Sequence, residues 1–116
     1  MNMIKMSENE AMSCHLLLDS VVLKDNRVQL IEIVNLKKPQ PLGGGDKLSL
    51  SSKIFEVIDL TTIEQTIYHM EIYEDLFAEG ACLASGEAKQ PTRSIPVESL
   101  SYKNYLFLRK HLGYSD

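Results

Sequence analysis

Asp19 is the strongest candidate in the sequence for a catalytic side chain. It lies in the largely apolar run AMSCHLLLDSVVLK, residues 11–24. If that run is a helix, a spacing of three and four residues gathers Asp19 on one face with Met12, His15, Leu16, Val22 and Leu23. A carboxylate on an apolar face loses hydration, which raises its pKa toward that of a general acid. A structural role is equally open, in which Asp19 caps backbone groups or pairs with His15 one turn earlier.

Cys14 is the second candidate, because the start of a helix lowers the pKa of a thiol. The sequence pairs no base with it, so a buried structural cysteine is the favoured interpretation. Cys14 and Cys82 lack the density of a disulfide framework and the spacing of metal ligands. The three histidines, His15, His69 and His111, are too dispersed to complete a site. We therefore expect no metal and no cofactor.

Composition narrows the class of protein. The chain has 116 residues, 44% hydrophobic and 24% charged, which is typical of one globular domain. A net charge of −4 argues against a protein that neutralises nucleic-acid phosphates. Neither a signal peptide nor an apolar stretch of membrane-spanning length is recognisable. With two free thiols, these features predict a cytoplasmic protein without a membrane span.

The elements that would position Asp19 and Cys14 are a helix, four strands and a second helix. The first helix is expected at about 10–24, closed by the turn signal Asp25-Asn26. Alternating apolar residues predict the strands, at about 27–37, 47–60, 63–75 and 80–89. The C-terminal helix is expected at about 97–112, with a docking stripe of Val97, Leu100, Leu108 and Leu112.

Two details of this pattern concern single positions. In the strand at 63–75, Tyr68, Met70 and Ile72 are expected to share one face, with His69 on the other. The run Gly43-Gly44-Gly45 lacks the Lys-Ser/Thr of a phosphate loop, so we expect a tight turn there.

Three stretches together resemble the hot-dog fold, and more narrowly the bacterial 3-hydroxyacyl-(acyl carrier protein) dehydratases. MSCHLLLDSV (12–21) resembles the central helix of that family, and GACLASGEA (80–88) resembles its closing strand. RVQLIEIVNLKKPQPLGGGDKLSL (27–50) resembles a strand, a proline-containing turn and the entry to the next strand. The resemblance implies a single α+β hot-dog domain over 1–116, with an antiparallel sheet curled around one central buried helix.

The same resemblance assigns roles to residues of the first helix. Asp19 takes the place of the helix acid that protonates the departing hydroxyl, and the backbone N–H of Cys14 faces the thioester carbonyl. Substrate contacts are expected from His15 and Leu16. The family's histidine base is missing, because its position falls near Lys5.

Three functions follow as alternatives. The first is an acyl-thioester-handling protein of the dehydratase (lyase) type in fatty acid or polyketide biosynthesis, degenerate because it lacks the histidine. It would bind an acyl carrier protein or coenzyme A thioester, as a homodimer or as a heterodimer with an active hot-dog subunit. The second is an acyl-CoA or acyl-carrier-protein thioesterase, in which Asp19 activates water or attacks the carbonyl. The third is a non-catalytic binding or assembly protein, in which Asp19 is structural.

Overall fold

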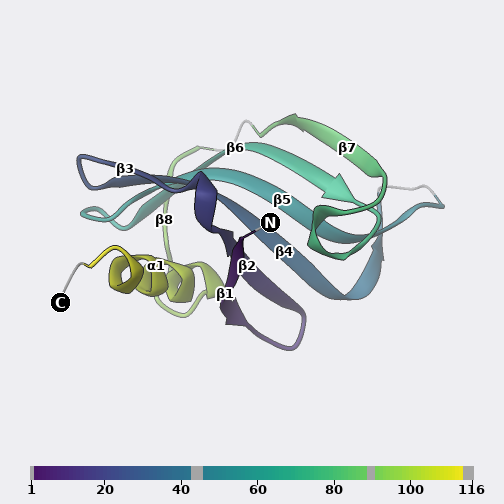
Figure 1. The fold of residues 1–116 in the computed structure, drawn as a ribbon, viewed down its shortest axis with the longest axis horizontal. Coiled ribbons are helices and arrows are strands. Elements are labelled where there is room, and N and C mark those ends of the chain that lie inside the picture. Colours follow the sequence, from purple (N-terminus) through teal and green to yellow (C-terminus); the bar gives the residue numbers. More distant parts are fainter. Residues whose placement is uncertain (1, 43–45, 89–90, 114–116) are drawn as a thin grey trace.

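An antiparallel sheet and one C-terminal helix make up the computed structural model, which describes residues 2–42, 46–88 and 91–113 (Figure 1). Two 3-10 turns, Leu18–Ser20 and Leu76–Ala78, interrupt the strands. The strands are β1 (Met3–Glu8), β2 (Met12–Leu17), β3 (Val22–Lys24), β4 (Arg27–Pro41), β5 (Leu48–Asp59), β6 (Glu64–Tyr73), β7 (Cys82–Glu87) and β8 (Arg93–Ser94), and the helix is α1 (Leu100–His111).

The sheet has the strand order β1-β2-β4-β5-β6-β7, with every neighbouring pair antiparallel. β3 also pairs with β4, next to the segment that pairs with β2, and β8 pairs with the start of β6. β4 and β5 form the long central pair, in register from Arg27 opposite Asp59 to Asn35 opposite Ser51. The tight turn expected at Gly43-Gly44-Gly45 lies outside the described residues.

The expected central helix at 10–24 is wrong. Asn9 turns the chain from β1 into β2, with its Oδ1 accepting from the backbone N–H groups of Ala11 and Met12. The turn signal Asp25-Asn26 does not end a helix either, because both residues adopt positive φ (51° and 66°) in the hairpin between β3 and β4. An apolar run of this length fits a buried strand as well as a buried helix.

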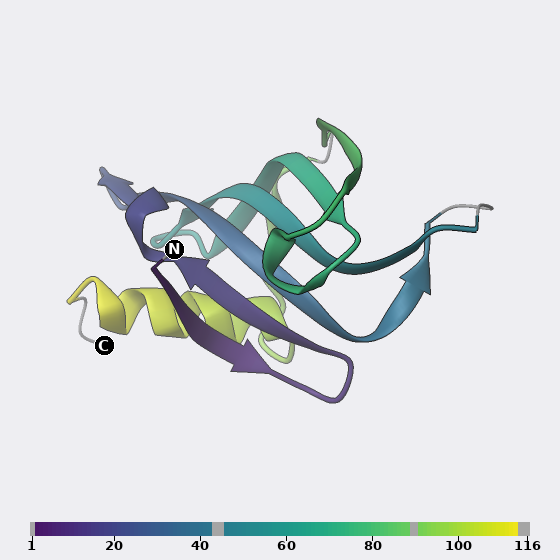
Figure 2. The ribbon, with the colours of Figure 1, turned by 45° about the vertical axis from the view of Figure 1, so that its right-hand side comes forward.

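The hot-dog architecture is therefore also wrong. A hot-dog sheet curls around a helix that follows the first strand, whereas this chain has strands there and its helix at the C-terminus. Figure 2 shows α1 (yellow-green) lying beside β1, on one side of the sheet. None of the helices among the described residues is long and apolar enough to span a bilayer.

Strand alternation divides the sheet into two faces, which we call the helix face and the opposite face. Register places Leu16, Leu30 and Ile58 on the helix face, the side on which α1 packs. His15, Phe55 and Val57 point the other way, to the opposite face. The two faces differ in burial and in chemistry, and each contains a candidate site.

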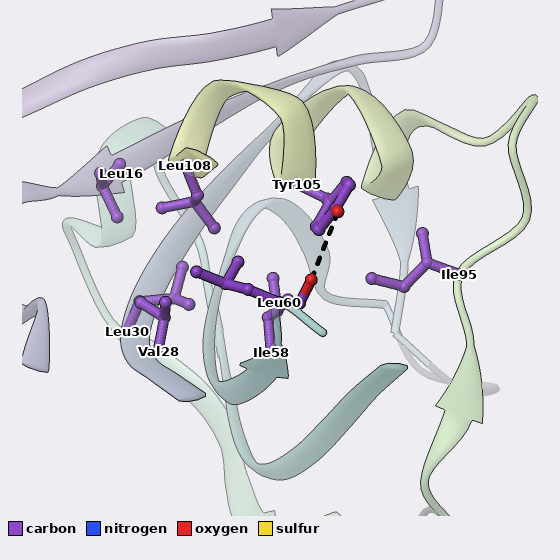
Figure 3. Packing of buried hydrophobic residues seen from close by; sticks show 8 residues of the cluster. All are labelled: Leu16, Val28, Leu30, Ile58, Leu60, Ile95, Tyr105 and Leu108. Carbon is purple, nitrogen blue, oxygen red and sulfur yellow. Dashed lines mark hydrogen bonds between the residues drawn. The ribbon is translucent and has the colours of Figure 1, made fainter. Parts of the chain in front are cut away.

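The hydrophobic core lies between α1 and the helix face (Figure 3). Tyr105 and Leu108 of α1 are 4% and 0% exposed, and the Tyr105 hydroxyl donates to the Leu60 carbonyl at 3.4 Å. Their partners in the cluster are Leu16, Val28, Leu30, Ile58, Leu60 and Ile95. This packing, rather than intrinsic propensity, stabilises a helix of only 12 residues.

The C-terminal helix begins later than expected. Ser99 is the N-cap, with its side chain accepting from the backbone N–H of Tyr102 at 3.2 Å. The predicted docking stripe is only partly correct, because Leu108 is buried but Val97 lies before the helix and is 71% exposed. Asn104 takes a buried position on α1 that no apolar pattern predicts.

Candidate functional site

A cluster of polar side chains is buried between the helix face and α1. Glu32, Glu56, Gln65 and Asn104 are between 1% and 5% exposed, and the neighbouring Cys14 is 3% exposed. We call these five residues the buried polar cluster. Each comes from a different element: β2 contributes Cys14, β4, β5 and β6 contribute Glu32, Glu56 and Gln65, and α1 contributes Asn104. Buried carboxyl groups are costly unless other groups satisfy them, so their partners decide what the cluster does.

Hydrogen bonds connect the cluster to α1. The Asn104 amide donates to Glu32 at 3.1 Å, while its oxygen accepts from the Ser7 hydroxyl of β1. The Gln65 amide donates to Glu56 Oε1 at 3.2 Å. Glu56 Oε2 has no donor to accept from among the described residues, and the Glu56 carboxyl faces that of Glu32. A proton on the Glu56 carboxyl resolves this, because it makes that carboxyl a donor as well as an acceptor.

The pKa directions agree with a shared proton. Burial raises the pKa of Glu56 well above its usual value, and the adjacent Glu32 charge raises it further. Burial also raises the pKa of Glu32, opposed by its hydrogen bonds with Glu56, Cys14 and Asn104. The pKa of Cys14 rises to about 12 through burial and then through the Glu32 charge. A thiol held neutral in this way is a poor nucleophile.

The cluster borders a cavity of about 150 Å³, which reaches Arg93 and the start of α1. Two carboxyl groups sharing one proton can serve acid–base chemistry, but here the Glu32 carboxyl joins the sheet to α1 by accepting from Asn104, and the Glu56 carboxyl joins β5 to β6 by accepting from Gln65. Among the described residues, no group of three or more His, Cys, Asp and Glu side chains could hold a metal ion. The sequence did contain a signal for this cluster: alternation in the strand at 27–37 places Glu32 with Val28, Leu30 and Val34.

The residues predicted as a site from the sequence do not come together. Asp19 is exposed in the 3-10 turn after β2, rather than on an apolar helix face. Cys14 and Leu16 are buried on the helix face. His15 lies on the opposite face, where its Nε2 is 2.9 Å from the Ser13 hydroxyl. Burial lowers the pKa of His15, and the nearby Lys5 charge lowers it further.

A β-bulge in β6 shapes the opposite face. Phe55 pairs with His69 and Glu56 pairs with Ile67, which leaves Tyr68 as an extra residue in β6. Tyr68 and His69 therefore lie on the same face, each with its ring beside Phe55, at centroid distances of 6.3 Å and 4.9 Å. The prediction that Tyr68, Met70 and Ile72 share one face is wrong. Register places Met70 and Ile72 on the helix face, whereas Tyr68 is on the opposite face.

We call Phe55, Tyr68 and His69 the aromatic cluster. Tyr68 is 37% exposed, and its hydroxyl accepts from the Gln29 amide at 2.9 Å. The Lys53 ammonium lies 5.7 Å from the centre of the Phe55 ring, a cation–π distance. Sequence reasoning missed this cluster because a bulge depends on how two strands pair, which neither strand shows alone.

A groove of about 700 Å³ adjoins the aromatic cluster through Gln29. It lies between the β3–β4 hairpin and the β5–β6 hairpin, and Val22, 56% exposed, is part of its wall. Its other lining residues are Lys24, Asp25, Arg27, Gln29, Val57, Asp59, Thr61 and Thr62. The opposite face thus combines exposed aromatic and aliphatic side chains with charges of both signs, as protein-binding surfaces do.

Comparison with known proteins identifies the family of this chain. The model of a family described as surface-adhesin protein E matches residues 4–107. The chain belongs to the surface-adhesin protein E family. Solved structures of a family member, Haemophilus influenzae protein E, share its fold. One has a TM-score of 0.68 at 13% identity, over 100% of this chain and 99% of that chain.

Two further structures agree. Crystal form II of Haemophilus influenzae protein E has a TM-score of 0.69 at 12% identity, over 93% of this chain and 94% of that chain. Protein E from non-typeable Haemophilus influenzae has a TM-score of 0.60 at 12% identity, over 100% of this chain and 91% of that chain. No curated protein matches the chain.

Membership of the protein E family corrects the function expected from the sequence. The hot-dog resemblance was wrong. The functions expected from it are therefore wrong as well: dehydratase (lyase) activity, thioesterase activity and a place in fatty acid or polyketide biosynthesis. Acyl carrier protein, coenzyme A thioesters and an active hot-dog subunit are likewise wrong as partners. A surface-adhesin family also contradicts the expected cytoplasmic location. The alternative of a non-catalytic binding protein fits the family better.

Proposed function

We propose that the chain is a non-catalytic adhesin that binds a protein partner through the opposite face of its sheet. The observation that carries this proposal is the bulge in β6, which gathers Tyr68 and His69 beside Phe55 on a face that α1 does not cover. Bulges re-aim side chains and are frequent at functional sites. Family membership supplies the class of function, since the family is named for surface adhesion.

The chemistry of this face suits a protein partner. Tyrosine presents a large rigid ring with a hydroxyl that hydrogen-bonds, and it is enriched among residues that dominate binding energy. The adjoining groove is a recess lined by charges of both signs. Lys24 and Arg27 are basic, and Asp25 and Asp59 are acidic. The part of the helix face that packs against α1 has no such role in the proposal, because the hydrophobic core lies there.

Adhesion of the purified chain tests the proposal. Beads coated with the full chain are settled on an epithelial cell monolayer and on the matrix that such cells deposit, and bound beads are counted after washing. We expect adhesion, and we expect Phe55→Ala with Tyr68→Ala to reduce it strongly. Truncation of one central aromatic residue costs about 2 kcal/mol of binding energy, or about thirtyfold in affinity.

Leu106→Ala is the matched control, because Leu106 is an exposed apolar residue (44%) on α1. Thermal unfolding of each variant verifies that it remains folded. A chain that does not adhere at all would overturn the assignment as an adhesin. A Phe55→Ala/Tyr68→Ala variant that adheres as well as the parent would overturn the assignment of the face.

A further inference from the structure

The loop between β6 and β7 adopts a backbone that side chains rarely tolerate. Two consecutive non-glycine residues, Phe77 (φ 59°, ψ 34°) and Ala78 (φ 56°), are in the left-handed region. Tight hairpin turns can place two residues in this region but usually have Asn, Asp or Gly there, so a phenylalanine and an alanine are strained, and strain of this kind concentrates at ligand clamps and active sites. We call residues 74–80 the 74–80 loop.

Buried polar side chains of the sheet hold this conformation. The Asn35 side-chain oxygen, on β4, accepts from the backbone N–H of Phe77 at 2.8 Å. The Ser51 hydroxyl, on β5, accepts from the backbone N–H of Ala78 at 2.9 Å and donates to the Asp75 carbonyl. Asn35 and Ser51 are 6% and 0% exposed. Figure 2 shows the loop (green) lying over β5 and β4, where these two residues are.

The loop is closed tightly around its tip. The Asp75 N–H donates to the Glu79 carbonyl at 3.1 Å, and the Glu74 N–H donates to the Ala81 carbonyl at 3.0 Å. Gly80 has φ 75°, and a side chain there would collide with the Asp75 carboxylate. The sheet and the loop therefore fix one conformation of residues 75–80.

This fixed conformation holds two large apolar side chains at the surface. Leu76 is 42% exposed and Phe77 is 37% exposed, at the tip of the loop. Phe77 rests on His15, with ring centroids 5.2 Å apart in an edge-on arrangement, so its position is set from below as well. Contiguous exposed apolar side chains with a polar rim are typical of protein–protein interaction sites.

Acidic residues surround the exposed tip. Glu74, Asp75 and Glu79 are all exposed, and the segment EDLFAEG contains no lysine or arginine. A partner that covers Leu76 and Phe77 must therefore accommodate three negative charges at the rim of the contact. Charge complementarity requires basic residues around the pocket that receives them.

We propose that the 74–80 loop is a docking element, which inserts Leu76 and Phe77 into an apolar pocket rimmed by basic residues on a protein partner. This inference rests on the proposed adhesin function and names the class of partner surface. It also assigns Asn35 and Ser51 as the residues that position the loop for binding.

The test uses the same bead adhesion assay with the full chain on cell-deposited matrix. We expect Leu76→Ala with Phe77→Ala to lower adhesion at least about tenfold, as removal of two apolar anchors should. Leu106→Ala is the matched control, because Leu106 is an exposed apolar residue of α1 and lies outside the loop. Glu74→Gln with Glu79→Gln should weaken adhesion and reduce its dependence on the NaCl concentration.

The outcomes separate this inference from the proposed function. Normal adhesion of the Leu76→Ala/Phe77→Ala variant, beside a loss in the Phe55→Ala/Tyr68→Ala variant, overturns the docking loop and leaves the adhesin proposal standing. An unchanged salt dependence in the Glu74→Gln/Glu79→Gln variant overturns the basic rim. A parent chain that does not adhere overturns both proposals. Because Phe77 also contacts His15, Leu76→Ser alone provides a second variant, with no ring contact to lose.

Discussion

The two faces of the sheet place polar and apolar groups in opposite ways. On the helix face, two carboxyl groups and two amides are buried and hydrogen-bonded to one another, with the core beside them. On the opposite face, Tyr68, Leu76 and Phe77 are exposed to water. Burial of polar groups costs free energy unless they are paired, and exposure of apolar groups forgoes their burial. The comparison teaches that the helix face specifies the fold and the opposite face is available for a partner.

The largest expected effect is a loss of stability from a substitution in the hydrophobic core beside the helix face. Leu108→Ala removes a fully buried side chain of α1 and leaves a cavity against the sheet. We expect a loss of about 2–5 kcal/mol in the free energy of unfolding, measured by urea denaturation. A loss below about 1 kcal/mol would show that α1 contributes little to the fold.

The second prediction concerns the shared proton of the buried polar cluster. Glu32 and Glu56 have raised pKa values, so the folded chain binds more protons than the unfolded chain, whose glutamates have the usual pKa of 4.5. Their contribution to stability is present in full below pH 4.5 and is lost as the pH rises through the folded pKa values. We expect stability to decline toward alkaline pH for this reason. Glu56→Gln keeps a donor to Glu32 but cannot ionise.

Glu56→Gln should therefore flatten this decline and stabilise the chain at alkaline pH by about 1–3 kcal/mol, the cost of a buried polar group without a partner. Urea denaturation across a pH series measures both quantities. Among the residues that the structure describes, Cys14 and Arg93 are the other titratable groups that face the pair. His15 acts in the opposite direction, because its lowered pKa gives stability above pH 6.5 that is lost on acidification. An identical pH profile for parent and variant would contradict the shared proton.

A smaller effect on stability is expected from a substitution on the opposite face. Tyr68→Phe removes only the hydroxyl that accepts from Gln29 and keeps the ring beside Phe55. Because this hydrogen bond is exposed, we expect a change of at most about 0.5 kcal/mol in stability, at the low end for such bonds. Binding should weaken if the hydroxyl faces the partner, and the bead assay of the two proteins side by side measures this. A large loss of stability would place Tyr68 in the fold rather than at the interface.

The last prediction is a gain in stability. Ala78→Gly relieves a positive φ of 56° but makes the unfolded chain more flexible. The left-handed conformation costs a side-chain residue about 1–2 kcal/mol, and the entropy of glycine takes back about 0.5–1 kcal/mol. We expect a net stabilisation of about 0.5–1 kcal/mol in thermal or urea unfolding. Destabilisation by this substitution would mean that Ala78 is not strained.

Sequence patterns located the central strands but not β2 and β3. β4 and β5 lie where β-branched and other apolar residues predict strands at 27–37 and 47–60. Residues 11–24 are apolar on all sides, so period two and period 3.6 fit them equally, and tertiary pairing with β4 decides for the strand. The turn signal Asp25-Asn26 was visible, but it serves a hairpin rather than a helix end.

The candidate sites divide in the same way. Alternation alone places Glu32 and Glu56 among apolar neighbours, so these two residues of the buried polar cluster could have been predicted from the sequence. The aromatic cluster was not, because the extra residue Tyr68 follows from the register between β5 and β6. The strain at Phe77 and Ala78 depends on Asn35 and Ser51, which are 42 and 27 residues away in the chain.

One paired measurement tests the division between the two faces most directly: bead adhesion and urea unfolding of Phe55→Ala/Tyr68→Ala beside Glu56→Gln. We predict that the first variant loses adhesion with a change in stability of about 1 kcal/mol or less per aromatic contact. The second variant should change the pH dependence of stability and adhere like the parent. Loss of adhesion in Glu56→Gln, with full adhesion in Phe55→Ala/Tyr68→Ala, would contradict the account.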